Sequence, residues 1–341
     1  MQLLALDDAR WAEFVGSRAD ATPFHHPAWA RLLADCYGYR PFVLAAPAGA
    51  GELVGGLPVL EVNAPWHGRR WVSLPFTDYC PPLAPTADTP GGLAVALDTA
   101  RERARVSRLE LRAPLGGPAS SAGAAAVRHT LRLQADDRAL LRTFKPSQVQ
   151  RNIKRAEREG VEARRGAARA DLVDTYYRLH LQTRQRLGAP VQPRRFFDLL
   201  WRRMLEPGLG FVLLATVRGQ PVAGAVFLAW NGTIIYKYGA SDAAHWKARP
   251  NHAIFWAAIR WGCEHGYHTF DFGRTDLDNA GLRDFKAGWG TTEEPLRYTT
   301  LADRPARHGS GRSSKALGAV IRRSPPWVCR CLGEVLYKYA A

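Results

Sequence analysis

Apolar and polar positions follow a regular order of strand and helix patterns between residues 211 and 273. The patterns predict these elements in turn: strands at Phe211–Val217, Val222–Trp230 and Thr233–Gly239, a loop at Ser241–Asn251, a helix at Ala253–His265 and a strand at His268–Gly273. The dipeptide Asn231-Gly232 is typical of a two-residue hairpin turn, and Gly266 is a typical helix end. We therefore expect a mixed, mostly antiparallel sheet flanked by helices.

The first 135 residues contain the same kinds of pattern. Helical periodicity occurs at Asp7–Val15, Pro27–Tyr37 and Gly91–Arg105, and strand patterns at Pro41–Ala46, Glu52–Glu61, Arg70–Leu74, Ser107–Ala113 and Val127–Gln134. We interpret residues 1–135 and 136–303 as two domains of the α/β (α+β) class with one shared architecture, although no sequence repeat is detectable. Residues 304–341 would then form a separate tail.

The entry to the second domain, residues 136–206, is predicted to be helical and is strongly basic. Between Arg138 and Arg169 there are ten Arg or Lys residues and three Glu residues. Ile153 and Ala156 would form a narrow apolar stripe, which leaves four cations for solvent or for an anion: Arg151, Lys154, Arg155 and Arg158. A charge run is usually a solvated helix face. Because three acids cannot neutralise ten bases, we favour contact with phosphate groups, as in a nucleic acid.

The tail has eight Arg or Lys residues and a single acid, Glu334. Two short amphipathic helices are predicted, at Ala316–Ile321 and Trp327–Tyr339, interrupted by Pro325-Pro326. A basic amphipathic segment is typical of peripheral binding to an anionic membrane surface. Packing of the tail back onto the preceding domain is an equally good interpretation, and the pattern does not separate the two.

Composition and charge narrow the class of partner. Hydrophobic residues make up 46% and charged residues 23% of the 341 positions, which is ordinary for a globular protein, but the formal net charge is +16. Such an excess favours a polyanionic partner. The five cysteines show no metal-ligand spacing with histidine, so we expect no metal site. No signal peptide or membrane span is recognisable, and we expect a cytoplasmic protein, peripheral to the inner face of the membrane if the tail binds lipid.

A proline-framed loop at Pro75–Pro82 stands out in the first domain. It presents Asp78 and Tyr79 between prolines, which predicts a rigid wall of a substrate-binding groove. A rigid turn with its side chains packed inward explains the same pattern equally well.

Three motifs together resemble one family. They are Arg151-Asn152-Ile153-Lys154-Arg155-Ala156 followed by Gly160-Val161, then Phe270-Asp271-Phe272-Gly273-Arg274, then Phe285-Lys286-Ala287-Gly288-Trp289-Gly290. In this order they resemble the FemAB/FemX-like branch of the GNAT acyltransferase superfamily. The resemblance implies tandem GNAT-like domains and transfer of an aminoacyl group from aminoacyl-tRNA to an amine of a cell-envelope precursor. Two family features are not matched: a long coiled-coil arm and a first-domain lysine for a nucleotide phosphate.

The loop before the helix predicted at Ala253–His265 indicates which kind of acyl donor the protein uses. A standard GNAT domain holds the CoA pyrophosphate on a glycine-rich loop at a helix N-terminus. The corresponding segment here, residues 245–252, has no glycine, and Trp246 and Pro250 would hinder close approach of a pyrophosphate to the backbone. Lys247, Arg249 and Asn251 remain as substrate-binding candidates. This favours aminoacyl-tRNA over acyl-CoA as donor, and no tightly bound cofactor is expected.

The resemblance also indicates candidate catalytic residues. Lys286, between Phe285 and Trp289, would bind an anionic group or stabilise an oxyanion, and Arg274 and Trp289 would contact substrate. Asp271 is a candidate base, along with Asp276, Asp278 and His252, although a buried structural carboxylate explains Asp271 at least as well. Tyr238, predicted on the same strand face as Tyr236, would protonate the leaving group, with core packing as the default alternative.

The sequence thus predicts a FemAB/FemX-type acyltransferase with tRNA, a cell-envelope precursor or a small amine as partners. Two alternatives stay open. One is an acyl-CoA-dependent N-acetyltransferase of exopolysaccharide synthesis, and the other is a tandem GNAT binding module without catalytic activity.

Overall fold

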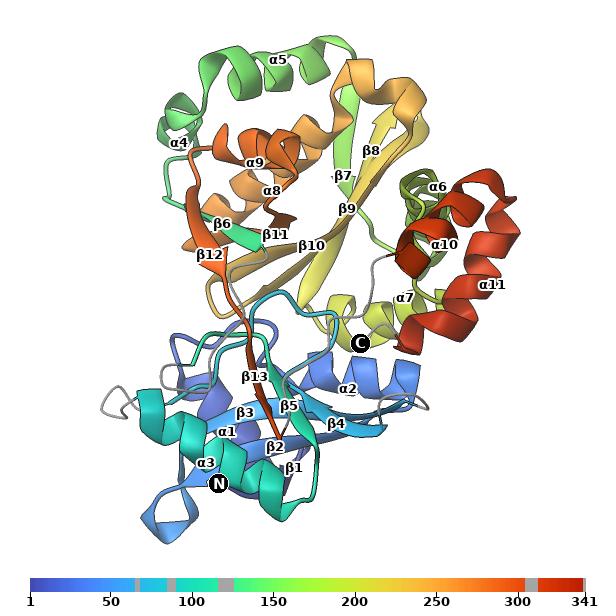
Figure 1. Cartoon of the computed structure of the whole chain (residues 1–341). Helices are drawn as coiled ribbons and strands as arrows, with labels where there is room; N and C mark the ends of the chain where they lie inside the picture. Colours follow the sequence, from blue (N-terminus) through green and yellow to red (C-terminus); the bar gives the residue numbers. More distant parts are fainter. Residues whose placement is uncertain (65–67, 85–89, 116–125, 304–311, 340–341) are drawn as a thin grey trace. The chain divides into compact units, whose positions relative to one another are not determined.

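A computed structural model describes residues 1–64, 68–84, 90–115, 126–303 and 312–339. The chain divides into two compact units, the first made of Met1–Val127 and Pro295–His308, the second of Arg128–Glu294 and Gly309–Ala340 (Figure 1). The boundaries expected from the sequence lay after residues 135 and 303. The expected and the observed boundaries differ because strands near both junctions belong to another sheet than their place in the sequence suggests. Residues 304–311 of the predicted tail lie outside the described part.

The first unit is built on one six-stranded sheet. Its strands, in spatial order, are β1 (Gln2–Ala5), β2 (Arg40–Pro47), β3 (Leu53–Ala64), β4 (Gly68–Val72), β5 (Arg108–Leu111) and β13 (Thr299–Ala302). Only the β4–β5 pair is parallel. The helices of this unit are α1 (Ala9–Ser17), α2 (Pro27–Tyr37) and α3 (Pro90–Arg103). The prediction of a mixed, mostly antiparallel sheet flanked by helices is confirmed for this unit.

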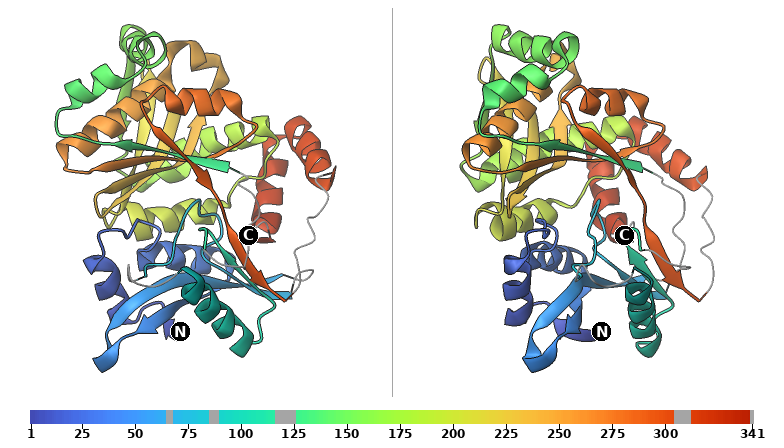
Figure 2. Two further views of the ribbon diagram at one scale, coloured as in Figure 1. Left: turned by 60° about the vertical axis from the view of Figure 1, so that its left-hand side comes forward. Right: turned by 90° about the vertical axis from the view of Figure 1, so that its left-hand side faces the viewer.

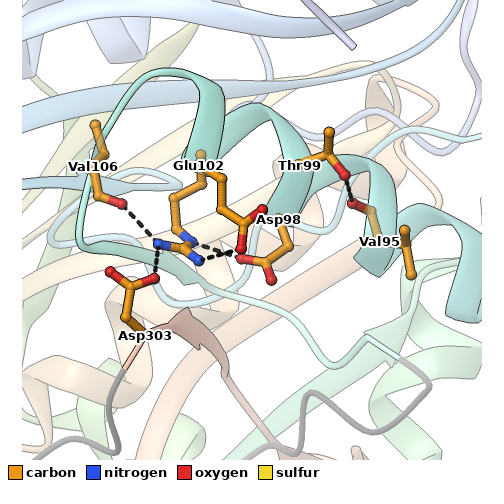
Figure 3. Close-up of polar contacts among 7 residues, drawn as sticks. Val95, Asp98, Thr99, Glu102, Val106 and Asp303 are labelled. Carbon is orange, nitrogen blue, oxygen red and sulfur yellow. Dashed lines mark hydrogen bonds and ion pairs between the residues drawn. The ribbon is translucent and has the colours of Figure 1, made fainter.

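Strand β13 belongs to the first sheet although it follows the second unit in the chain. Arg101 of α3 is only 2% exposed and helps to hold its end (Figure 3). Its guanidinium donates to Asp303 Oδ1 at 2.7 Å, to Asp98 Oδ1 at 2.6 Å and to the carbonyl of Val106 at 2.9 Å. A single buried arginine thereby links the last strand of this sheet to α3.

The second unit contains a seven-stranded sheet. Its spatial order is β12 (Thr292–Leu296), β6 (Ala126–Arg132), β11 (Thr269–Asp276), β10 (Thr233–Ser241), β9 (Gln220–Trp230), β8 (Gly210–Val217) and β7 (Val161–Arg165). Its helices are α4 (Asp137–Thr143), α5 (Arg151–Arg158), α6 (Tyr177–Leu187), α7 (Arg194–Leu200), α8 (Pro250–Glu264), α9 (Ala280–Ala287), α10 (Arg312–Arg323) and α11 (Pro326–Leu336). Both sheets are mixed, so the predicted fold class is confirmed.

The strand and helix order predicted between residues 211 and 273 is confirmed as β8, β9, β10, α8 and β11. Asn231 and Gly232 both have positive φ, 50° and 71°, as a two-residue hairpin turn requires. The expectation that residues 136–206 are wholly helical is wrong at β7. That strand is an edge strand with mostly exposed side chains, so its pattern shows little hydrophobic alternation.

Two layers of helices cover opposite faces of the second sheet. Helix α8 packs on the face that carries Phe211, Phe227 and Phe270, in a core with Phe272 and Trp289. The helical turn Asp171–Tyr176 and α6 pack on the other face, where a Cβ on Gly224 would lie 2.9 Å from the Tyr176 ring. This second layer includes a buried polar chain in which His180 Nδ1 lies 3.3 Å from Tyr176 Oη and His180 Nε2 lies 2.8 Å from Gln192 Oε1.

The buried His180 predicts loss of stability in acid. Burial lowers its pKa to about 3, so the folded protein keeps the ring neutral while the unfolded chain binds a proton below about pH 6.5. The contribution of His180 to the free energy of unfolding is therefore fully present above pH 6.5 and is lost as the pH drops towards 3. Between pH 7.5 and 4 the free energy of unfolding should fall by roughly 3 kcal/mol more in the native protein than in His180→Gln. Urea titrations at both pH values measure this difference, and equal losses would contradict it.

Candidate functional site

The parallel strands β10 and β11 pair only over their first residues. The paired positions are Thr233 with Thr269, Ile234 with Phe270, and Ile235 with Asp271. Both strands then continue without further pairing to each other, to Ser241 and Asp276. In open α/β sheets, ligands bind beyond the carboxyl ends of parallel strands where neighbouring strands part. The residues that follow Ile235 and Asp271 are therefore the first place to look for a site.

A β-bulge between Tyr236 and Tyr238 changes the direction of side chains in β10. The Tyr236 ring lies 4.8 Å from Phe255 of α8, whereas the Tyr238 ring lies 5.7 Å from Phe196 of α7 and 6.0 Å from His180. The two tyrosines thus face opposite helix layers. The prediction that they share a strand face is wrong, because the extra residue of the bulge breaks the strict alternation on which it rested.

Asp271 is 7% exposed at the point where β11 leaves β10. Its Oδ1 accepts a hydrogen bond of 2.7 Å from the backbone N–H of Gly273, and its Oδ2 lies 3.9 Å from the guanidinium of Arg128. Gly273 has a φ of +71°, a left-handed conformation that favours glycine. The carboxylate therefore stabilises the turn of the strand backbone, which is the structural interpretation of Asp271. Arg274 is exposed and pairs with Asp276 at 2.6 Å.

Lys286 approaches this turn from α9. The side chain is 2% exposed, and its Nζ donates to the carbonyl of Gly273 at 2.8 Å and to that of Arg274 at 3.1 Å. The ammonium therefore caps the two carbonyl groups at the positive-φ residue of β11 and the residue after it. A buried charge without partners would be very unfavourable, and these charge-assisted hydrogen bonds offset its desolvation. The result is a fixed positive charge beside the divergence of β10 and β11.

Trp289 and His252 pack behind Lys286. Trp289 is fully buried, and its ring stacks on His252 at 5.9 Å and an angle of 27°. His252, in the first turn of α8, has its Nε2 3.4 Å from the side-chain nitrogen of Asn152 on α5. Burial lowers the pKa of His252 to about 4, and the charge of Arg249 acts in the same direction. Trp289, expected as a substrate contact, is thus a core residue that holds α9 against α8.

The loop before α8 forms the 3-10 turn Ala243–Ala248. Lys247 and Asn251 are exposed, while Arg249 is half-buried with a φ of 63° at the position before the helix. Trp246 is 47% exposed and is fixed by its Nε1–H bond of 2.9 Å to Ser241 Oγ and by Arg186, whose guanidinium lies 4.7 Å from its ring. Lys247, Arg249 and Asn251 are thus brought together at the N-terminal end of α8, the end that contacts α5.

The predicted phosphate-binding cations lie on one helix. Pro146, Gln150, Arg151, Lys154 and Arg158 line a surface hollow of about 420 Å³ along α5 and the turn before it. Arg151, Lys154 and Arg158 have no ion-pair partner among the described residues, whereas Arg155 lies 3.5 Å from Glu159. The sequence therefore identified three unpaired cations on this face, and a fourth that is paired.

Asp78 and Tyr79 belong to the first unit and are half-buried. The hydroxyl of Tyr298 donates to the carbonyl of Asp78 at 2.8 Å and fixes the loop from the side of the last strand. The group around Lys286, in contrast, consists of residues from the second unit alone.

One buried cluster beside Lys286 was missed from the sequence. His129 of β6 is fully buried, and its Nε2 lies 3.0 Å from Glu293 Oε2. Glu293 in turn pairs with Arg283 of α9 at 2.7 Å. Burial lowers the pKa of His129, the charge of Lys286 lowers it further, and Glu293 acts in the opposite direction. No short motif links β6, α9 and β12, so only the sheet order brings these residues together.

Comparisons with known proteins identify the second unit. A family model described as an acetyltransferase (GNAT) domain matches residues 145–287, from the turn before α5 to the end of α9. Those residues therefore match a GNAT domain. A lipid II:glycine glycyltransferase of Staphylococcus epidermidis is 32% identical over 98 residues, which cover 26% of this chain and 24% of that protein. The match therefore spans only about a quarter of the curated relative.

Solved structures extend the likeness to the whole chain. The crystal structure of FemX matches with a TM-score of 0.71 and 16% identity, over 89% of this chain and 97% of that chain. A tandem GNAT protein from the clavulanic acid biosynthesis pathway matches with a TM-score of 0.53 and 14% identity, over 90% and 99%. At this identity the likeness shows the fold alone, and this chain shares it with FemX and with that tandem GNAT protein.

The described residues contain no cluster of three or more His, Cys, Asp or Glu side chains suited to a metal ion. None of the helices in the described part of the chain is both long and apolar enough to cross a membrane.

Proposed function

We propose that this FemX-like protein is an acyltransferase that moves an aminoacyl group from aminoacyl-tRNA to an amine. The observation that carries the proposal is the Lys286 ammonium, buried on the carbonyls of Gly273 and Arg274 where β10 and β11 part. Acyl transfer develops negative charge on the carbonyl oxygen of the donor. A fixed cation in a dry surrounding stabilises such an oxyanion more strongly than water does.

The proposed reaction is attack of a neutral amine on the ester carbonyl of the donor. A C–N bond forms, the ester C–O bond breaks, and the proton that the amine nitrogen loses passes to the leaving oxygen. Lys286 stabilises the oxyanion through its charge. Tyr238 packs against Phe196 of α7, in the helix layer opposite to that of α8 and α9, so its role as donor to the leaving oxygen stays a prediction of the sequence. Asp271 acts as a positioning residue, because its hydrogen bond to Gly273 shapes the carbonyls that hold Lys286. Placement of the reactants supplies much of the remaining rate enhancement.

Two features of the second unit support an RNA-linked donor over acyl-CoA. The loop before α8 has Arg249 and Pro250 where a pyrophosphate would need close backbone approach and free N–H groups. The unpaired cations of α5 lie on the helix that contacts the first turn of α8. Lys247, Arg249 and Asn251 extend the polar surface beside them. A donor with several phosphates in a row fits this arrangement.

The acceptor we propose is an amine of a peptidoglycan precursor. The relative from Staphylococcus epidermidis is a lipid II:glycine glycyltransferase by name, and the FemX structure shares the fold. Such an acceptor implies action on the cytoplasmic side of the cell membrane. N-acetylation of an amino sugar from acyl-CoA is the second candidate, because the family model that matches residues 145–287 is described as an acetyltransferase domain. A binding module without activity is the third.

Binding at fixed ionic strength separates the donor classes. The proposal predicts that charged tRNA binds more tightly than uncharged tRNA, and that acetyl-CoA produces no thermal shift. The salt concentration must be the same throughout, because a protein of charge +16 binds any RNA to some extent. A thermal shift with acetyl-CoA, together with equal binding of charged and uncharged tRNA, would contradict the donor assignment.

The α5 cations predict the salt dependence of RNA binding. Arg151, Lys154 and Arg158 span about 10 Å along the helix axis, enough for two or three successive phosphates. Replacing all three with Gln should lower the slope of log K against log salt by about 2, since each lost phosphate contact removes about 0.7–0.9. The matched control is Arg202→Gln, whose guanidinium pairs with Asp198 at 3.0 Å. An unchanged slope in the triple variant would exclude α5 from the interface.

A further inference from the structure

Trp246 is an exposed aromatic side chain that is held in a fixed position. Its Nε1–H donates to Ser241 Oγ at 2.9 Å, and the guanidinium of Arg186 lies over the ring, 4.7 Å from its centre. Arg186 is itself fixed, because its Nη1 donates to the carbonyl of Ser241 at 3.0 Å. The last residue of β10 therefore holds the edge of the indole, and α6 covers one of its faces.

Packing in the core does not account for this tryptophan. Trp246 is 47% exposed although Ser241 and Arg186 already cover part of it, whereas Trp289 in the core is fully buried. Because one edge and one face are engaged, the exposed surface lies mainly on the second face of the indole. An aromatic ring that is held by polar contacts can bind a planar group without losing side-chain freedom. The second face of Trp246 is therefore suited to stacking.

The backbone that carries Trp246 is constrained, and it is basic. Asp242 Oδ1 accepts a hydrogen bond of 3.0 Å at the start of the 3-10 turn, and the N–H of Arg249 donates to the carbonyl of Trp246 at 3.0 Å. Lys247 and Arg249 follow the ring in the chain, and neither has an ion-pair partner among the described residues. An aromatic ring that accompanies Arg and Lys side chains is the combination with which proteins bind single-stranded nucleic acid.

We propose that Trp246 is a stacking site for one unpaired base of the RNA donor, near the 3′ end that carries the amino acid. The inference rests on the proposed function, because it assigns one contact of the same donor. Strands β10 and β11 part after Ile235, and Ser241, which holds the indole, is the last residue of β10. The ring is thus fixed at the carboxyl end of β10, beyond the point where the two strands part, as is the group around Lys286 on β11.

Binding of two RNA hairpins with the sequence of a tRNA acceptor stem tests the proposal on the full-length protein. One hairpin has its unpaired 3′ nucleotides intact, and the other carries abasic nucleotides there, so that the phosphates remain and only the bases are lost. At one fixed salt concentration, the native protein should bind the intact hairpin about five- to 150-fold more tightly, the range expected for one base stacked on an aromatic ring. Trp246→Ala should bind both hairpins equally, and Trp246→Phe should retain part of the preference.

A second exposed tryptophan provides the control. Trp327 is 64% exposed on α11. Figures 1 and 2 show α10 and α11 beside α6, which both helices contact, so the tail packs back on the second unit as one of its two interpretations expected. Trp327→Ala should keep the native preference for the intact hairpin. The α5 variant with Gln at Arg151, Lys154 and Arg158 should bind both hairpins more weakly by the same factor, because phosphate contacts do not depend on the bases.

Two results would overturn the proposal. No preference in the native protein, or an unchanged preference in Trp246→Ala, would show that no base stacks on this ring. A thermal shift with acetyl-CoA that Trp246→Ala loses, without any base preference, would assign the ring to the adenine of CoA. The hairpins carry no amino acid, so the test is separate from transfer. A Trp246-dependent preference without transfer from charged tRNA would support the base site and contradict the proposed function, and transfer without the preference would do the reverse.

Discussion

Replacement of Lys286 by methionine is expected to lower the rate of acyl transfer about 100- to 1,000-fold. Methionine keeps the length and apolar stem of the side chain but removes the ammonium that lies 2.8 and 3.1 Å from the carbonyls of Gly273 and Arg274. Loss of one oxyanion-stabilising group in other enzymes has effects of this size. Single-turnover transfer from a saturating donor measures the chemical step, and the affinity for the donor should change far less than the rate.

A lower rate could also arise from unfolding, and two measurements address this. The two carbonyls lose a charged donor in Lys286→Met, which should cost about 1–3 kcal/mol of stability, so the variant is assayed well below its melting temperature. The control is Lys145→Met, which removes an exposed lysine. The Nζ of Lys145 lies 3.4 Å from Asp284, and Asp284 is on α9, the helix that carries Lys286. It should retain native activity. A folded Lys286→Met protein with native rates would show that the buried ammonium is purely structural.

Trp289→Ala should produce the largest loss of stability in the second unit, about 3–5 kcal/mol. The ring is fully buried and lies between 5.3 and 6.2 Å from the rings of Phe144, Phe255 and Phe285. Alanine would leave a cavity that rigid aromatic neighbours fill poorly. The indole Nε1 has no hydrogen-bond partner among the described residues, so Trp289→Phe loses only volume and should be much milder. Urea unfolding followed by circular dichroism measures both variants.

Trp327→Ala is the matched control, because that tryptophan is 64% exposed. It should change the free energy of unfolding by no more than about 0.5 kcal/mol. Equal effects at the two tryptophans would mean that the aromatic core described around Trp289 does not carry the stability of this unit. Activity of Trp289→Ala below its melting temperature is also informative. A selective rise in the Michaelis constant for the acceptor would favour the substrate contact first expected for this residue.

The elements around residues 211–273 could be predicted because local signals and burial agree there. Strands β8 and β9 are mostly apolar, Asn231-Gly232 specifies a tight turn, and α8 has a regular apolar face. Strand β7 was not predicted because an exposed edge strand carries little hydrophobic pattern. Strands β12 and β13 were also missed, since their assignment depends on which neighbours they pair with and that information is not local.

The candidate site was predictable only as a set of motifs. The motif Phe285-Lys286-Ala287-Gly288-Trp289-Gly290 indicated Lys286 as a residue for an anionic group, but not its burial on two backbone carbonyls, which the structure shows. The direction of Tyr238 depends on a β-bulge that leaves no sequence signature. His129 could not be identified, because its neighbours Glu293 and Lys286 come from elements more than 150 residues further along the chain. Motifs locate the chemistry, and tertiary packing decides which way each side chain faces.

The most direct test of the central claim is transfer of a radiolabelled amino acid to a peptidoglycan precursor with a free amine. Charged tRNA and acyl-CoA are offered in parallel reactions to the native protein and to Lys286→Met. The account predicts labelled acceptor only with charged tRNA, sensitivity of the transfer to ribonuclease treatment of the donor, and transfer at least about 100-fold slower in Lys286→Met. Transfer from acyl-CoA alone would contradict the donor assignment. Absence of transfer from both donors, or equal transfer by Lys286→Met, would contradict the claim that this group is an acyltransferase site.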